Sequence, residues 1–437
     1  MGSWSEESFC FPLKGPLMRK FPTRKSRAIV FMGFLILLIL VGVGSARAIL
    51  RGGNDFLVFY EAWRLVLSGR GAEIYHVSPD RFLYGPGFAW LLSPLGLLPR
   101  VFSLGLWCFL KILCIGALIK LMTQSKGQER SVFALGMSVW GVILVSRPLL
   151  IDFEYGQVNL FILWASVWAL LEHFRKESGN GRGFLCWSIL TFTAIAKLLP
   201  LPLLLVPWLA TQGVSRHKLR FERLGILFGF FMTFLLPFLS LGWTGSWTLL
   251  LNWREAILAK GLPLESHNQS FSAFLYHYLS GNPTSVIAEG REPLLLGHAW
   301  LSSNQILYLS LAWAIGSIGA LLAWLVAARR HGPFKWVAVT TGLLIVPSHL
   351  IWKPYFVMSM PLAILILQYA VSESSWKYWG LVLALFAGIN LTGFDFVGHH
   401  LGAHFEAASL LLMIHLIMIA LVVRHPISVR NSFKQAS

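Results

Sequence analysis

The stretch AIVFMGFLILLILVGVGSA, residues 28–46, decides the structural class of this chain. It contains no charged side chain, and a helix of this length crosses roughly 30 Å of hydrocarbon. Similar apolar runs recur along all 437 residues, of which 56% are hydrophobic and only 13% are charged. Backbone amides inside a bilayer must be hydrogen-bonded within their own segment, so such runs form helices. The sequence therefore predicts an all-α polytopic membrane protein.

The apolar runs predict about twelve transmembrane helices. We expect the first helix to remain in the protein rather than be cleaved as a signal peptide. Its apolar run is longer than the apolar region of a signal peptide, which usually has about 7 to 15 residues. Pro200, Pro202 and Pro207 favour two short or broken helices within 184–211 instead of two full crossings. The expected spans are 28–50, 101–121, 131–148, 157–174, 184–197, 199–211, 222–242, 301–328, 334–351, 354–371, 376–393 and 406–424.

The distribution of basic residues predicts the orientation. Lysines and arginines gather in alternate connections, together with the amino-terminal tail, which is the pattern of cytoplasmic segments. It accounts for much of the formal net charge of +17, so nucleic-acid binding is not needed to explain that charge. We expect cytoplasmic tails at 1–27 and 425–437, one membrane domain at 28–424, and outer loops at 51–100 and 243–300. Neither loop has room for an ordinary soluble nucleotide-binding domain.

The first outer loop is expected to begin with an amphipathic helix. Asn54 is a suitable helix cap, and apolar residues then recur at helical spacing: Phe56, Phe59, Tyr60, Trp63 and Leu67. This pattern predicts a helix in the membrane interface with its aromatic side chains inserted into the bilayer. Asp55 lies in its first turn, where it either stabilises the helix end or takes part in chemistry.

Further polar side chains follow at the expected outer ends of the spans. A short loop carries Arg147, Asp152, Glu154, Gln157 and Asn159. Amides that continue into a span favour a polar cavity, because an unsatisfied amide in hydrocarbon is costly. Lys197 lies deeper, where the alternatives are a snorkelling side chain and a cation facing that cavity.

Two later segments combine cations and hydrogen-bonding groups. His267, Asn268 and Gln269 form a polar run that suits a hydroxyl-rich ligand or a plain turn. His349 and Lys353 are four residues apart, so they would share one face of a continuing helix. A cation at headgroup level is a natural partner for phosphate. Three histidines near Asp395 match no metal-binding spacing, and we expect neither a metal nor another cofactor.

These groups gather on the predicted outer face of a helical bundle. An acid, several cations and amides suit the transfer of a group from a phosphate-bearing lipid. Such a lipid supplies both the activated donor and the leaving group, so no nucleotide-binding domain is required.

The motifs resemble those of polytopic GT-C glycosyltransferases, most closely glycosyltransferase family 87. The motifs that carry the resemblance occur in this order: Asn54-Asp55-Phe56 with Tyr60, Tyr84-Gly85-Pro86, Tyr155-Gly156-Gln157-Val158-Asn159, Lys197, His267-Asn268-Gln269-Ser270, and Ser348 to Tyr355. That family includes polyprenol-phosphate-mannose-dependent enzymes. The resemblance implies an inverting, metal-independent transfer of mannose or another hexose to a lipid or glycan acceptor, within the cell membrane and on the extracytoplasmic side.

The residues and the resemblance together assign roles. Asp55 is expected to be the general base. Contacts with the donor phosphate are expected from Lys353, His349, Arg147 and Lys197. Contacts with the sugar or acceptor are expected from Tyr60, Tyr84, Glu154, Gln157, His267, Asn268 and Gln269.

Two other functions stay open at this point. A polysaccharide ligase or polymerase would use a lipid diphosphate and a late outer loop such as 243–300, but it would not need Asp55. A lipid or solute transporter would be expected to show matched halves with broken helices at the midplane.

Overall fold

The computed structural model describes residues 24–76, 82–123, 132–175, 179–259, 265–284, 295–327, 331–373 and 375–425. Nearly all of these residues are helical, and over these ranges the chain forms no strand; an isolated bridge joins Ser280 and Ala299. The protein is therefore an all-α polytopic membrane protein, as predicted. Most of the predicted tails 1–27 and 425–437 lies outside the described residues.

Among the described residues, five helices are long and apolar enough to cross a membrane on their own. They are α1 (Arg24–Arg51), α4 (Arg100–Thr123), α10 (Arg216–Ala259), α12 (Ser303–Val326) and the stretch Lys353–Glu373 that includes α14 (Met360–Glu373). Two bent helix pairs raise this number to as many as seven within the described ranges. Three shorter apolar helices accompany them: α7 (Asn159–Phe174), α8 (Asn180–Ala196) and α17 (Leu410–Arg424).

The chain divides into two compact units. The first comprises Met1–Leu40, Ala117–Leu149 and Leu264–Ser437, and the second comprises Val41–Gly116 and Leu150–Pro263. This division follows from which residues of the chain pack against one another. The domain boundaries predicted from the sequence stay predictions.

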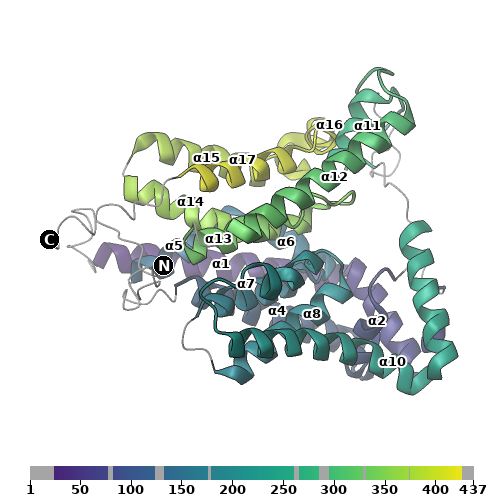
Figure 1. The fold of residues 1–437 in the computed structure, drawn as a ribbon. Helices are drawn as coiled ribbons and strands as arrows, with labels where there is room; N and C mark the ends of the chain where they lie inside the picture. Colours follow the sequence, from purple (N-terminus) through teal and green to yellow (C-terminus); the bar gives the residue numbers. More distant parts are fainter. Residues whose placement is uncertain are drawn as a thin grey trace. The chain divides into compact units, whose positions relative to one another are not determined.

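In the second unit, α8 packs against α7 and along α10 (Figure 1). Glycines permit the close approach of α8 and α10. A Cβ atom on Gly225 would lie 2.3 Å from the backbone oxygen of Phe184, and one on Gly229 would lie 2.6 Å from Cβ of Thr191. Small residues four apart are typical of closely packed membrane helices.

The predicted amphipathic helix is present as α2 (Asn54–Leu67), but its environment differs from the prediction. Gly53, with φ of 60°, precedes the helix at the cap position expected for Asn54. The aromatic side chains expected to enter the bilayer are buried in the protein instead. Phe56, Phe59 and Trp63 are fully buried and pack around Trp107 of α4. Burial of this aromatic face fixes α2, and with it Asp55, on the second unit.

Helix α10 breaks at Gly242, where the predicted span 222–242 ends, and a second helical segment then continues to Ala259. The predicted loop 243–300 therefore begins as a helix. Gly242 has φ of 68°, which favours glycine, and the segment after it turns sharply away in Figure 1. The predicted span 199–211 is two short pieces, η5 (Leu201–Leu205) and α9 (Val206–Leu209), in agreement with its prolines.

In the first unit, α14 packs against α5 (Val132–Leu144), α13 (Pro333–Leu343), α15 (Trp376–Asn390) and α17. Figure 1 shows α14, α15 and α17 side by side. The predicted span 334–351 is shorter than expected, because α13 ends at Leu343. The 3-10 helix η7 (Lys353–Ser359) follows after an irregular segment. His349 and Lys353 therefore do not share a helix face, and that prediction was wrong.

Two helices of the first unit, α5 and α15, are each followed by a sharp bend into a further helix. Helix α5 meets α6 (Ser146–Tyr155) at 67°, and α15 meets α16 (Phe394–Ala407) at 80°. Asn390 bridges the first break: its side-chain oxygen accepts from the Arg147 backbone N–H at 2.8 Å, and its nitrogen donates to the Leu144 carbonyl at 2.8 Å. This one amide satisfies backbone groups that the break would leave unpaired.

Candidate active site

Asp55 and Lys197 are charged neighbours in the second unit. Asp55 lies in the first turn of α2 and is half-buried. Lys197 directly follows α8, and the charges that act on its ammonium come from Asp55, Asp152 and Lys111. The sequence placed these groups on separate segments. The structure brings a carboxylate and a cation, both expected to be functional, into one electrostatic neighbourhood.

Two amides hold the Lys197 ammonium. Lys197 donates to the side-chain oxygen of Asn159 at 2.9 Å and to that of Gln157 at 3.2 Å. The Tyr84 hydroxyl donates to the same Gln157 oxygen at 3.4 Å, and the Tyr84 ring centroid lies 5.9 Å from the ammonium. Gln157 and Asn159 are fully buried. Snorkelling therefore does not describe Lys197, whose ammonium is bound inside a polar network.

Tyr84 is itself fixed through its backbone. The Tyr75 hydroxyl donates to the Tyr84 carbonyl at 2.8 Å. Burial raises the pKa of Tyr75 well above its usual value, so its phenol stays protonated and able to donate.

The turn between α6 and α7, which carries both amides, is clamped by α4. Lys111 donates to the Asp152 carboxylate at 2.7 Å, and both side chains are fully buried. One helical turn away, the Trp107 indole donates to the Gly156 carbonyl at 2.8 Å. Gly156 has φ of 67°, and a Cβ there would lie 2.5 Å from Cβ of Phe56. Sequence reasoning missed Lys111, although a lysine amid an apolar span is itself a signal of function.

Two predicted contacts with sugar or acceptor are already engaged within the protein. The buried carboxylate of Glu154 pairs with Arg51 and lies 3.7 Å from Arg47. The Tyr60 hydroxyl donates to the Leu98 carbonyl at 2.9 Å. In this structure both side chains hold segments of the second unit together.

The first unit contains a separate ionic cluster. Lys353 pairs with Glu406 of α16, and Arg147 Nη2 lies 3.3 Å from the same carboxylate. Arg147 also donates to the Thr392 hydroxyl at 3.0 Å, and the Lys353 ammonium lies 5.0 Å from the Phe394 ring centroid. Two predicted phosphate ligands thus share one buried carboxylate that sequence reasoning did not select. Asp395 adds a further negative field on both cations.

The polar run that contains Asn268 and Gln269 acts as a brace. The Asn268 oxygen accepts from the Ile351 backbone N–H at 3.0 Å, and its nitrogen donates to the His349 carbonyl at 3.1 Å. The Gln269 side chain donates to the Glu406 carbonyl. Both residues are fully buried, so their side chains fix the backbone that precedes Lys353 and the end of α16. His267 lies beside Trp352, with ring centroids 5.8 Å apart.

Other features of the first unit offer less for catalysis. Over the described ranges, no group of three or more His, Cys, Asp or Glu side chains could hold a metal. His349 is exposed, and its backbone carbonyl rather than its ring is bound by Asn268. A small cavity between η7, α15, α17 and the break between α5 and α6 has room for about one water.

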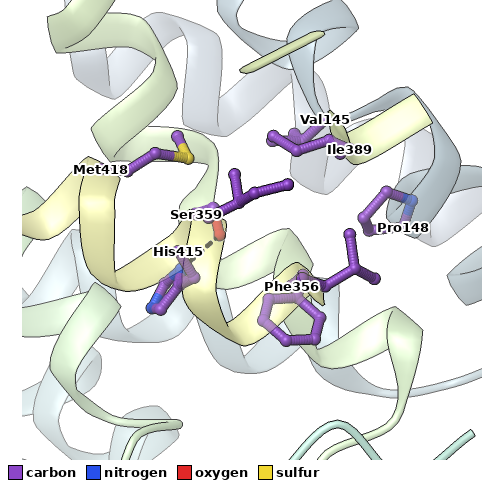
Figure 2. A pocket seen from close by; sticks show the side chains of 9 residues that line it. Val145, Pro148, Phe356, Ser359, Ile389, His415 and Met418 are labelled. Atoms are coloured by element: carbon purple, nitrogen blue, oxygen red, sulfur yellow. Dashed lines mark hydrogen bonds between the residues drawn. The ribbon is translucent and has the colours of Figure 1, made fainter. Parts of the chain in front are cut away.

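The cavity contains a serine–histidine pair. Figure 2 shows Ser359 and His415 at its wall, 2.6 Å apart. The other His415 ring nitrogen donates to the Gly342 carbonyl at 2.8 Å. The rest of the lining is apolar, so this pair joins helices and has no space for a substrate.

Comparison with known proteins decides the family. The sequence profile described as "Glycosyltransferase family 87" matches residues 82–351, more than half of the chain. This chain belongs to glycosyltransferase family 87. The matched range includes Tyr84, Gln157, Lys197 and the brace at 267–269, but neither Asp55 nor Lys353.

A second comparison finds a curated relative. The chain is 29% identical over 166 residues to the alpha-(1->3)-arabinofuranosyltransferase of Corynebacterium glutamicum. The aligned part covers 36% of this chain and 38% of that relative. No solved structure matches the chain. Family membership and the helical fold together make this chain a multi-pass membrane member of glycosyltransferase family 87.

Proposed function

We propose that this family 87 enzyme moves a sugar from a polyprenyl-phosphate donor to a lipid-linked or glycan acceptor, with inversion at the anomeric carbon. The family supports glycosyl transfer. The helical organisation supports a lipid-borne donor, because over the described ranges the chain forms no separate soluble domain for a nucleotide sugar. The reaction takes place at the extracytoplasmic face, where the distribution of basic residues places loop 51–100.

The observation that carries the proposal is the neighbourhood of Asp55 and Lys197. Asp55 removes the proton from the acceptor hydroxyl while that oxygen bonds to the anomeric carbon. The bond from the anomeric carbon to the donor phosphate breaks, and polyprenyl phosphate leaves with the electron pair. Lys197 interacts electrostatically with Asp55, and it opposes negative charge that develops on the leaving phosphate.

The remaining polar groups of the second unit orient the substrates. Tyr84 and Gln157 hold Lys197 and offer hydrogen bonds to sugar hydroxyls. Glu154 and Tyr60 support the same surface through Arg51 and the Leu98 carbonyl.

The first unit carries its own candidate phosphate ligands, Lys353 with Arg147 and His349. Glu406 is the carboxylate within ion-pair distance of both Lys353 and Arg147. A phosphate that reaches the two cations competes with this carboxylate, and this competition weakens phosphate binding. His267 contributes to the acceptor side, while Asn268 and Gln269 hold the segment that precedes Lys353.

Two sugar classes are candidates for the donor. Mannose or another hexose follows from the family resemblance. An arabinofuranosyl group is the second candidate, because the curated relative is an arabinofuranosyltransferase. Both reach the same site on the same phosphate carrier, so the mechanism is common to them.

The test is transfer by the purified enzyme in lipid vesicles. Polyprenyl-phosphate mannose and polyprenyl-phosphate arabinofuranose are supplied separately, with nucleotide sugars and a polyprenyl-diphosphate glycan as comparison donors. The acceptor is a lipid extract of a strain that lacks the gene, and products are read by mass spectrometry. We expect a product of defined added mass from one monophosphate donor. Transfer only from the diphosphate donor would establish a ligase or polymerase, and movement of labelled lipid without a product would establish a transporter.

A further inference from the structure

We propose that Lys111 and Trp107 of α4 are positioning residues that hold Lys197 beside Asp55 through the turn between α6 and α7; this inference rests on the proposed roles of Asp55 and Lys197. Both side chains are buried and bonded to the turn, so their proposed effect on the reaction is indirect. Their effect on the reaction is transmitted through three layers of contact, each of which lies within the second unit.

The first layer is the clamp on the turn. Lys111 and Trp107 are four residues apart on α4 and therefore project from the same face. Lys111 binds both the carboxylate and the backbone carbonyl of Asp152, and Trp107 binds the Gly156 carbonyl. The Gln157 backbone N–H also donates to the Asp152 carbonyl at 3.0 Å. The clamp thus fixes the backbone of residues 152–157.

The second layer is the orientation of the two amides. Gln157 and Asn159 point their oxygens at Lys197. Both amides adjoin the turn, so a shift of the turn would move the two oxygens that Lys197 binds.

The third layer is the approach of the turn to α2. Gly156 packs against Phe56, the residue after Asp55, so closely that no side chain fits between them. A shift of the 152–157 turn therefore changes both the amides that hold Lys197 and the backbone next to Asp55. A buried ion pair is weak evidence for stability, because apolar replacement of the whole pair is often neutral or stabilising. The Lys111–Asp152 pair is explained instead by the positions in which it holds the turn and the groups beside it.

The test removes the pair as a whole. In Lys111→Met/Asp152→Leu no buried charge is left unpaired, so the enzyme should insert and fold. We expect kcat to fall about 10- to 100-fold, a loss expected for misplaced catalytic groups. The KM for the donor should change less than about threefold, because the pair touches neither substrate. The matched control is His173→Phe/Glu222→Leu, which removes another fully buried pair of the second unit and should keep normal kcat.

A second, milder variant covers the case in which the double replacement does not fold. Trp107→Phe keeps an aromatic side chain but removes the hydrogen bond to Gly156 together with part of the indole volume, so kcat should fall about 3- to 10-fold. Its control is Trp187→Phe, at a fully buried tryptophan whose indole nitrogen has no hydrogen-bond partner among the described residues.

A positioning role also predicts non-additivity with Lys197. In a Lys197→Met background, the clamp variants should lower kcat less than about threefold further, because the group they position is already gone. Two results would overturn the inference. One is a fall of kcat in the Lys197→Met background as large as the clamp variants show in the wild-type background, and the other is a normal kcat of the clamp variants in the wild-type background.

Asp55→Asn is assayed in parallel. If Asp55→Asn is inactive while the clamp variants are normal, only this inference is lost. Normal turnover by Asp55→Asn would remove the general-base proposal, and this inference with it.

Discussion

Replacement of Glu406 by glutamine should destabilise the free enzyme and at the same time tighten its binding of donor. The carboxylate is in direct contact with Lys353 and lies 3.3 Å from Arg147, and its side chain is only 5% exposed. At an effective dielectric constant of about 20, one such pair carries about 5 kcal/mol of Coulomb energy. Desolvation offsets part of it, and broken buried pairs typically cost about 3 to 5 kcal/mol. We expect Glu406→Gln to lose stability in that range.

Donor binding should respond in the opposite sense. Without the carboxylate, the phosphate meets two cations that have lost their competitor, and the KM for the donor should fall about 10-fold, which corresponds to about 1.4 kcal/mol. Lys353→Ala should do the reverse and weaken donor use by about 2 to 4 kcal/mol. Initial rates at varied donor concentration, with melting curves recorded with and without polyprenyl phosphate, measure both effects.

The control for this experiment is Glu172→Gln. Glu172 is likewise a buried carboxylate shared by two arginines, at 2.9 Å and 3.3 Å, but it belongs to the second unit and pairs with none of the proposed phosphate ligands. It should lose stability without any change in the KM for the donor. An unchanged or higher KM in Glu406→Gln would refute the placement of phosphate at Lys353 and Arg147.

Three further outcomes are expected from single replacements. Gly156→Ala should lower stability by about 2 to 4 kcal/mol and should also lower turnover, because φ is positive and the added Cβ would lie 2.5 Å from a neighbouring side chain. The control is Gly105→Ala, whose Cβ would meet open space; it should be neutral in melting and activity assays. Asn390→Leu should cost about 2 to 4 kcal/mol in unfolding measurements, because backbone groups at the break between α5 and α6 lose their partner; an unchanged melting curve would contradict the bridging role. In a cysteine-free background, Ser68→Cys should react with an impermeant thiol reagent applied outside cells, and Gln212→Cys should react only after lysis; the opposite pattern would invert the predicted topology.

The helical class and the family could be predicted from the sequence, because both depend on local patterns. Apolar length alone indicates membrane helices. The spacing of aromatics from Phe56 to Trp63 predicted the extent of α2 well, and Gly69, with φ of 76°, ends that region. The environment of α2 could not be predicted, because an aromatic face looks the same whether it meets lipid or protein. Trp107, 51 residues after Phe56, decided that it meets protein.

The breaks in helices and the partners of charges depend on contacts that are distant in sequence. The break before Arg147 is stabilised by Asn390, 243 residues later. The partner of Lys353 is Glu406, which the sequence placed at the start of the last span. Lys111 was overlooked because its run is otherwise apolar. An ionisable residue within a span is expensive, and this cost is the signal that would have identified it.

The central claim, that Asp55 is the general base of glycosyl transfer, is tested most directly by turnover of purified Asp55→Asn with a synthetic polyprenyl-phosphate sugar. Asparagine has nearly the same shape but no useful basicity, and the helix cap at this end is Gly53 rather than Asp55. The account predicts that the variant folds, inserts and melts like the wild type, while kcat falls by about 10² to 10⁴. Asp55→Glu should also lose most activity, because an added methylene displaces the carboxylate. Near-normal kcat in Asp55→Asn would contradict the account and leave Asp55 with a structural role beside Lys197.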